Sequence, residues 1–160
     1  MKIINSNVID AVIEELENLS DEQYEERMEA FASAQPVLVA YLFDDENFHL
    51  LTDDEKGFLQ YLALIAWSAV IKTAGDVAAV SEEAIGEAEE KNYAVLEQST
   101  AKKFRDRLDP FFDNYPQEDL LAFAEEAVLE DEDDPDTLVS KEGREPIFIA
   151  MKTIIDVLTA

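Results

Sequence analysis

The sequence predicts an all-α protein: an irregular bundle of about seven to nine helices packed around a central apolar helix at residues 52–74. Apolar residues recur at the three- and four-residue spacing of helices, and Ser or Thr caps precede several of these runs. No run alternates apolar and polar residues over a strand's length, so we expect little or no sheet. A hydrophobic content of 48% in 160 residues is enough for one core, and residues 1–160 are predicted to form a single helical domain.

The first two helices are indicated by caps and apolar stripes. Asn5 or Ser6 can cap a helix whose apolar stripe occupies positions between residues 8 and 16. Ser20 and Gln23 have the spacing of a capping box, which predicts a second helix after Ser20.

The next two helices bring the chain to its most apolar segment. Pro36 suits a first helical turn, so residues 36–43 are predicted to form a short buried helix. Thr52 and Glu55 form a second capping box, and the helix that they open is expected to end at Gly75. This helix is apolar almost all round, which is typical of a helix packed on several sides.

Three further helices are predicted between residues 81 and 128. Ser81, Thr100 and Pro116 are the expected starts, and Pro110 is expected to bend the middle helix. Gly86 weakens the first of the three, because glycine is a poor helix former.

The last helix is expected to begin near Glu145 and Pro146 and to carry only two strongly polar positions beyond them, Lys152 and Asp156. A chain of this size has room to enclose one all-round apolar helix, but this sequence contains two. We therefore predict a homodimer through the C-terminal helix, in which a second copy covers the remaining apolar surface.

An acidic stretch precedes that helix. Its carboxylates are Glu130, Asp131, Glu132, Asp133, Asp134 and Asp136. As a calcium loop the stretch fails, because Pro135 occupies a ligand position and Asp136 the position of the turn glycine. Residues 130–142 are interpreted first as a solvated acidic linker, second as a partner-facing patch, and third as a metal site.

The charge balance limits the classes of partner. With 12 Lys and Arg against 38 Asp and Glu, the net charge is −26, so nucleic acid and anionic membrane surfaces are repelled. A basic protein is the partner that this charge favours. The chain has no cysteine, and its first residues lack the apolar core of a secretory signal, so a cytoplasmic location is expected.

One basic cluster runs against this balance. Lys102, Lys103, Arg105 and Arg107 fall within six residues, as KKFRDR. They could bind a phosphate or an acidic partner, or they could pair with the chain's own carboxylates, including those of the linker.

Catalytic patterns are incomplete. His49 is the only histidine, so the second histidine that a di-iron bundle needs is missing. A Ser-His-Asp site would have to use His49, and no nucleophile-elbow sequence accompanies it, so no catalytic residue and no cofactor are predicted. Glu25, Glu26 and Glu29 match half of a magnesium-binding pattern, whose other half would need Glu130 and Asp133.

Two functions follow from these observations. The first is a non-enzymatic acidic binding protein, such as an inhibitor, immunity-type protein or adaptor, that engages a basic protein partner. The partner-binding candidates are the acidic stretch and the basic cluster. The alternative is a magnesium-dependent carboxylate hydrolase of small phosphorylated substrates, with Glu25, Glu26 and Glu29 as the candidate metal ligands.

Overall fold

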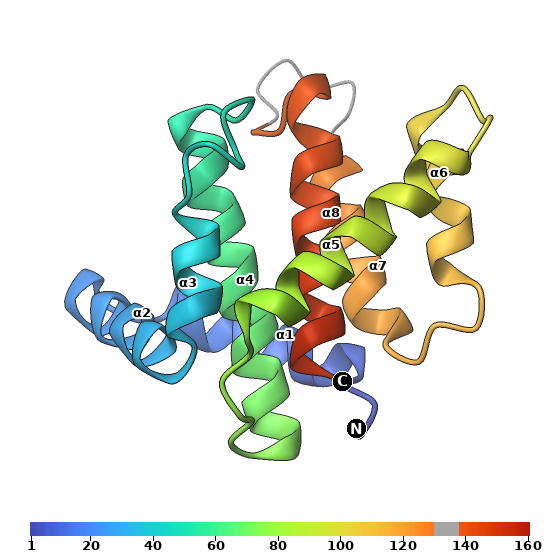
Figure 1. Ribbon diagram of the computed structural model, residues 1–160. Coiled ribbons are helices and arrows are strands. Elements are labelled where there is room, and N and C mark those ends of the chain that lie inside the picture. Colours follow the sequence, from blue (N-terminus) through green and yellow to red (C-terminus); the bar gives the residue numbers. More distant parts are fainter. Residues whose placement is uncertain (130–137) are drawn as a thin grey trace.

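A computed structural model describes residues 1–129 and 138–160, which form eight α-helices and no strand (Figure 1). The helices are α1 (Ser6–Glu17), α2 (Asp21–Ala34), α3 (Pro36–Leu42), α4 (Asp53–Ala74), α5 (Glu82–Gln98), α6 (Phe104–Phe112), α7 (Glu118–Leu129) and α8 (Lys141–Leu158). The predicted all-α class is confirmed for these residues.

Two buried helices, α4 and α8, form the centre of the fold. α8 packs against α4, α5 and α7, and α4 also packs against α1. Figure 1 shows α8 standing between α4 and α7, with α5 crossing in front of it. The predicted central helix is therefore present as α4, but it shares the centre with the C-terminal helix.

α4 is long and apolar enough to cross a membrane by length and composition, and no other helix in residues 1–129 and 138–160 is. Its apolar side chains are used inside the protein instead. Residues 62–70 are all buried, and the ring of Trp67 stacks on that of Phe31 with centroids 5.1 Å apart. Such burial is what a core helix requires.

Four predicted helix starts are confirmed at the level of hydrogen bonds. Asn5 accepts hydrogen bonds from the backbone at the start of α1, and Ser81 does the same for α5. Ser20 and Thr52 form complete capping boxes at the starts of α2 and α4. These caps depend on residues three positions apart, which is why the sequence alone could identify them.

The predicted start of α6 after Thr100 is wrong, because the helix begins at Phe104. Ser99 Oγ accepts a hydrogen bond of 3.3 Å from the backbone N–H of Ala101, so the chain turns before the helix starts. Lys103 occupies the N-cap position and supplies no side-chain cap.

The predicted start of α8 near Glu145 is also wrong, because the helix begins at Lys141 and includes Pro146. Ser140 is the N-cap, and its hydroxyl accepts a hydrogen bond of 3.2 Å from the N–H of Gly143. Of the predicted linker, residues 141 and 142 are helical, and residues 130–137 lie outside the described part of the chain.

The homodimer prediction assumed that one chain could not cover both apolar helices. This premise does not hold, because thirteen residues of α8 are buried by the chain itself. α8 therefore offers little apolar surface to a second copy, and the oligomeric state stays a prediction to be tested.

Candidate functional site

The carboxylates of the hydrolase hypothesis lie on an open surface. Glu25, Glu26 and Glu29 are all exposed on α2. Within residues 1–129 and 138–160, no group of three or more His, Asp or Glu side chains is arranged to hold a metal ion. His49 is exposed, and its Nδ1 lies 3.0 Å from the carbonyl oxygen of Glu46, which can only accept a hydrogen bond.

The acidic stretch predicted to face a partner lies outside the described residues. This applies to all six of its carboxylates: Glu130, Asp131, Glu132, Asp133, Asp134 and Asp136. The function assigned to them stays a prediction.

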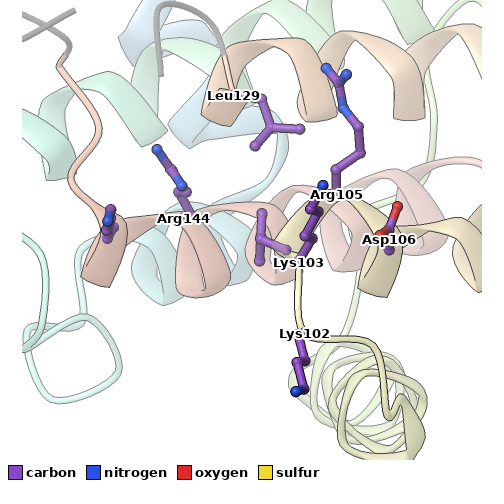
Figure 2. Close-up of a pocket in the computed structure, with 8 residues that line it drawn as sticks. Lys102, Lys103, Arg105, Asp106, Leu129 and Arg144 are labelled. Carbon is purple, nitrogen blue, oxygen red and sulfur yellow. The ribbon is translucent and has the colours of Figure 1, made fainter. Parts of the chain in front are cut away.

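Three members of the basic cluster line a pocket of about 760 Å³ (Figure 2). Its lining residues are Lys102, Lys103, Phe104, Arg105, Asp106, Leu129, Lys141 and Arg144. Figure 2 shows Lys102 and Lys103 on the segment that leads into α6, and Leu129 between Arg105 and Arg144 in that view. The pocket therefore joins the start of α6 to the start of α8 and the end of α7, which no local pattern indicated.

Arg107, the fourth member of the cluster, does not line this pocket. Its guanidinium donates a hydrogen bond of 3.3 Å to the carbonyl oxygen of Leu96 and lies 3.7 Å from a carboxylate oxygen of Glu145. Arg107 thus ties α6 to α5 and α8, and its role is structural.

A second concavity, which we call the α3/α5 groove, has the opposite character. It has a volume of about 490 Å³ and is lined by Pro36, Val37, Ala40, Tyr41, Asp44, Asn47, Glu82, Ile85, Gly86 and Glu89. These residues include three carboxylates and no Lys, Arg or His. The lining therefore combines apolar residues, which we call the floor, with three carboxylates, Asp44, Glu82 and Glu89, which we call the rim.

Tyr41 and Glu89 connect the two walls of this groove. The Tyr41 hydroxyl donates a hydrogen bond to Glu89 Oε2, and the Tyr41 ring meets that of Phe48 edge to face at 5.4 Å. Burial, followed by this hydrogen bond, raises the pKa of Tyr41 far above its ordinary range, so the phenol stays protonated and remains a donor.

No local pattern in the sequence predicts this groove. Pro36 indicates only a helix start, and Gly86 indicates only a weak point in a helix. A Cβ on Gly86 would meet no atom within 4 Å, so this glycine faces open space. The groove depends on the contact between α3 and α5, which are separate in the chain and adjacent in the fold.

A polar network is buried against α8. Lys152 Nζ lies 2.8 Å from Asp156 Oδ2, and Asp156 also accepts hydrogen bonds from Asn92 and from the Tyr115 hydroxyl. Burial and the hydrogen bond to Asp156 raise the pKa of Tyr115 above its ordinary range. All four side chains find partners within the network, and it opens into neither cavity, so we interpret it as structural.

Comparison with protein-family models, with curated proteins and with solved structures finds no match to the chain.

Proposed function

We propose that this protein is a non-enzymatic binding protein, of the inhibitor, immunity-type or adaptor kind, that engages a basic protein partner. We assign the α3/α5 groove as the place where a segment of that partner docks. The observation that carries the proposal is the combination of apolar lining residues with three carboxylates and no Lys, Arg or His, in a chain of net charge −26.

The rim carboxylates are available to cations. Asp44 and Glu82 are exposed, and neither they nor Glu89 forms an ion pair with any Lys or Arg of the described ranges. A Lys or Arg of the partner would contact Asp44 and Glu82 at the rim. Glu89 is held by Tyr41, so it contributes a fixed charge and not a mobile one.

The floor of the groove suits an apolar anchor. Val37 is 36% exposed, and a Cβ on Gly86 would meet no atom within 4 Å, so both positions are open to a ligand. A few buried side chains, most often Trp, Tyr or Arg, contribute most of the binding energy of an interface, while charged rims mainly set association rate and specificity. The proposed ligand is therefore a basic segment with an exposed aliphatic or aromatic residue.

The experiment begins with capture of basic proteins from the protein's own cell lysate at low and moderate salt. A retained partner is then purified and titrated against Gly86→Trp, which fills the groove. Gly57→Trp is the matched control, because a Cβ on Gly57, in α4, also meets no atom within 4 Å. We expect Gly86→Trp to weaken binding at least tenfold and Gly57→Trp to leave it unchanged.

A second pair of variants tests the charge. Asp44→Asn with Glu82→Gln removes two rim charges, and Glu22→Gln with Glu25→Gln removes two exposed charges of α2. Only the rim pair should weaken binding and reduce its salt dependence. Failure to retain a basic partner at either salt, or equal effects of both pairs, would contradict the proposal.

A further inference from the structure

The basic pocket at the start of α6 is the second unusual surface of this acidic protein. Five of the chain's 12 Lys and Arg residues line it, at positions 102, 103, 105, 141 and 144. Asp106 is the one carboxylate among the lining residues. Positive charge is therefore concentrated at this pocket, although the molecule as a whole has a net charge of −26.

The cations of the pocket make few contacts with the protein's own carboxylates. Lys102, Lys103, Arg105 and Lys141 are exposed, and none of them forms an ion pair with a carboxylate in residues 1–129 or 138–160. Arg105 acts at longer range on Glu125. Burial raises the pKa of this carboxyl group, and Arg105 offsets only part of the rise. Arg144 is buried and has interactions of its own, so the other four cations are the ones available to a ligand.

The helix geometry adds to this positive charge. The first three residues of α6, Phe104, Arg105 and Asp106, line the pocket, and Lys103 gives the helix no side-chain cap. The helices α1, α2, α4, α5 and α8 each have such a cap. Uncapped N–H groups carry the positive end of the helix dipole, which cations beside it make less favourable and an anion would offset.

From these observations we infer that this pocket binds a small organic phosphate that carries a diphosphate or an equally charged group. Lys103, Arg105 and the open start of α6 would contact the phosphate oxygens, and the fork of Arg105 suits them best. Lys102 and Lys141 would add positive charge around the site. The side chains of Phe104 and Leu129 would cover the organic part. The volume of about 760 Å³ lies within the range of small-molecule sites and exceeds what an inorganic ion fills.

A small ligand fits this surface better than a nucleic acid. A polyanion would extend beyond the pocket into the field of a chain that carries 38 acidic residues, whereas a ligand of a few atoms meets only the local cations. This site is separate from the α3/α5 groove, and its test does not depend on the proposed function.

The inference is tested by calorimetric titration at about 0.1 M salt with inorganic pyrophosphate and with a nucleoside diphosphate, both without divalent metal. We expect saturable binding of both, tighter for the nucleoside diphosphate. Lys103→Gln with Arg105→Gln should weaken each at least tenfold. Lys2→Gln with Lys91→Gln removes two exposed cations elsewhere and should change neither affinity.

Circular dichroism melting of each variant establishes that the fold is retained before binding is compared. Lack of saturable heat with both probes at millimolar concentration would overturn the inference and would favour neutralisation of the cations within the chain. Equal losses in the two double variants would also overturn it, because binding would then reflect total charge and not this pocket.

Discussion

The two ends of α8 bury charged side chains in different ways. Near its first turn, Glu55 of α4 is 1% exposed and accepts hydrogen bonds of 3.0 Å from the backbone N–H groups of Thr52 and Ser140 and from the Ser140 hydroxyl. Near its last turns, Lys152 is 7% exposed and forms an ion pair with Asp156. One buried charge is surrounded by neutral donors, and the other is paired with an opposite charge.

A buried charge that is stabilised by neutral donors requires stricter geometry than one that is paired with an opposite charge. Burial alone would raise the pKa of Glu55, but the hydrogen bonds from Thr52 and Ser140 outweigh it and hold this pKa below its ordinary value. They can do so only because Gly143 has no side chain, since a Cβ there would lie 2.0 Å from Glu55 Oε2. The Lys152 ammonium has alternatives, because it also contacts Asn92 Oδ1 and lies 4.3 Å from the centre of the Tyr115 ring.

The largest expected effect comes from breaking the ion pair between Lys152 and Asp156, near the last turns of α8. Lys152→Met keeps the apolar stem but leaves Asp156 without its cation, which should lower the free energy of unfolding by about 3 kcal/mol in urea denaturation. Adding Asp156→Asn removes the uncompensated charge and should recover at least half of the loss. A loss below about 1 kcal/mol in the single variant would show that the pair contributes little.

At the first end, Gly143→Ala should be the most damaging small substitution. The added methyl displaces the Glu55 carboxylate from Ser140, and we expect a loss of about 2 kcal/mol in the same assay. Gly57→Ala is the control, because it adds a methyl to open space on α4 and should gain about 0.5–1 kcal/mol from helix propensity. The same sign for both variants would contradict the close approach of Gly143 to Glu55.

The dependence of stability on pH further distinguishes the end of α8 near Glu55 from the end near Lys152. Because the pKa of Glu55 is lowered in the folded protein, its contribution to the free energy of unfolding is complete above the unfolded-state pKa of about 4.3. This contribution is lost as pH falls through the folded-state pKa. Glu55→Gln should therefore cost about 1–2 kcal/mol at neutral pH, and this cost should shrink below about pH 4. The difference between the two unfolding curves isolates Glu55 from the many other carboxylates, and a difference independent of pH would contradict its role.

A smaller effect concerns a buried hydroxyl group that has no hydrogen-bond partner in the described part of the chain. Ser68 on α4 is 4% exposed, and within the described residues its hydroxyl has no hydrogen-bond partner. Ser68→Ala should raise the free energy of unfolding by about 1 kcal/mol, because it removes an unsatisfied polar group. Ser140→Ala provides the contrast, since it removes a hydroxyl that bonds to both Glu55 and Gly143 and should destabilise the protein.

The smallest expected effect is on assembly. Because the chain itself buries thirteen residues of α8, sedimentation velocity should show no association through this helix over a range of protein and salt concentrations. A dimer that strengthens with salt and is broken by substitution on α8 would instead restore the homodimer prediction.

The sequence by itself determined the helical class, the buried centre in α4 and the starts of α1, α2, α4 and α5. Each of these depends on apolar periodicity or on a cap three residues away, which are local properties of the chain. The same reasoning identified the basic cluster. It did not predict that Arg107 would contact Leu96 and Glu145 and not line the pocket with the other three residues.

Only the tertiary structure decided where α8 begins, how Glu55 is satisfied and which residues form the two cavities. The cap of α8 is stabilised by Glu55, 85 positions before Ser140 in the chain, and Gly143 is needed for that contact and not for a helix stop. The α3/α5 groove and the basic pocket likewise bring together residues that are far apart in the chain. Side-chain periodicity predicts which face of a helix is buried, but the neighbour that covers this face depends on the packing of the whole chain.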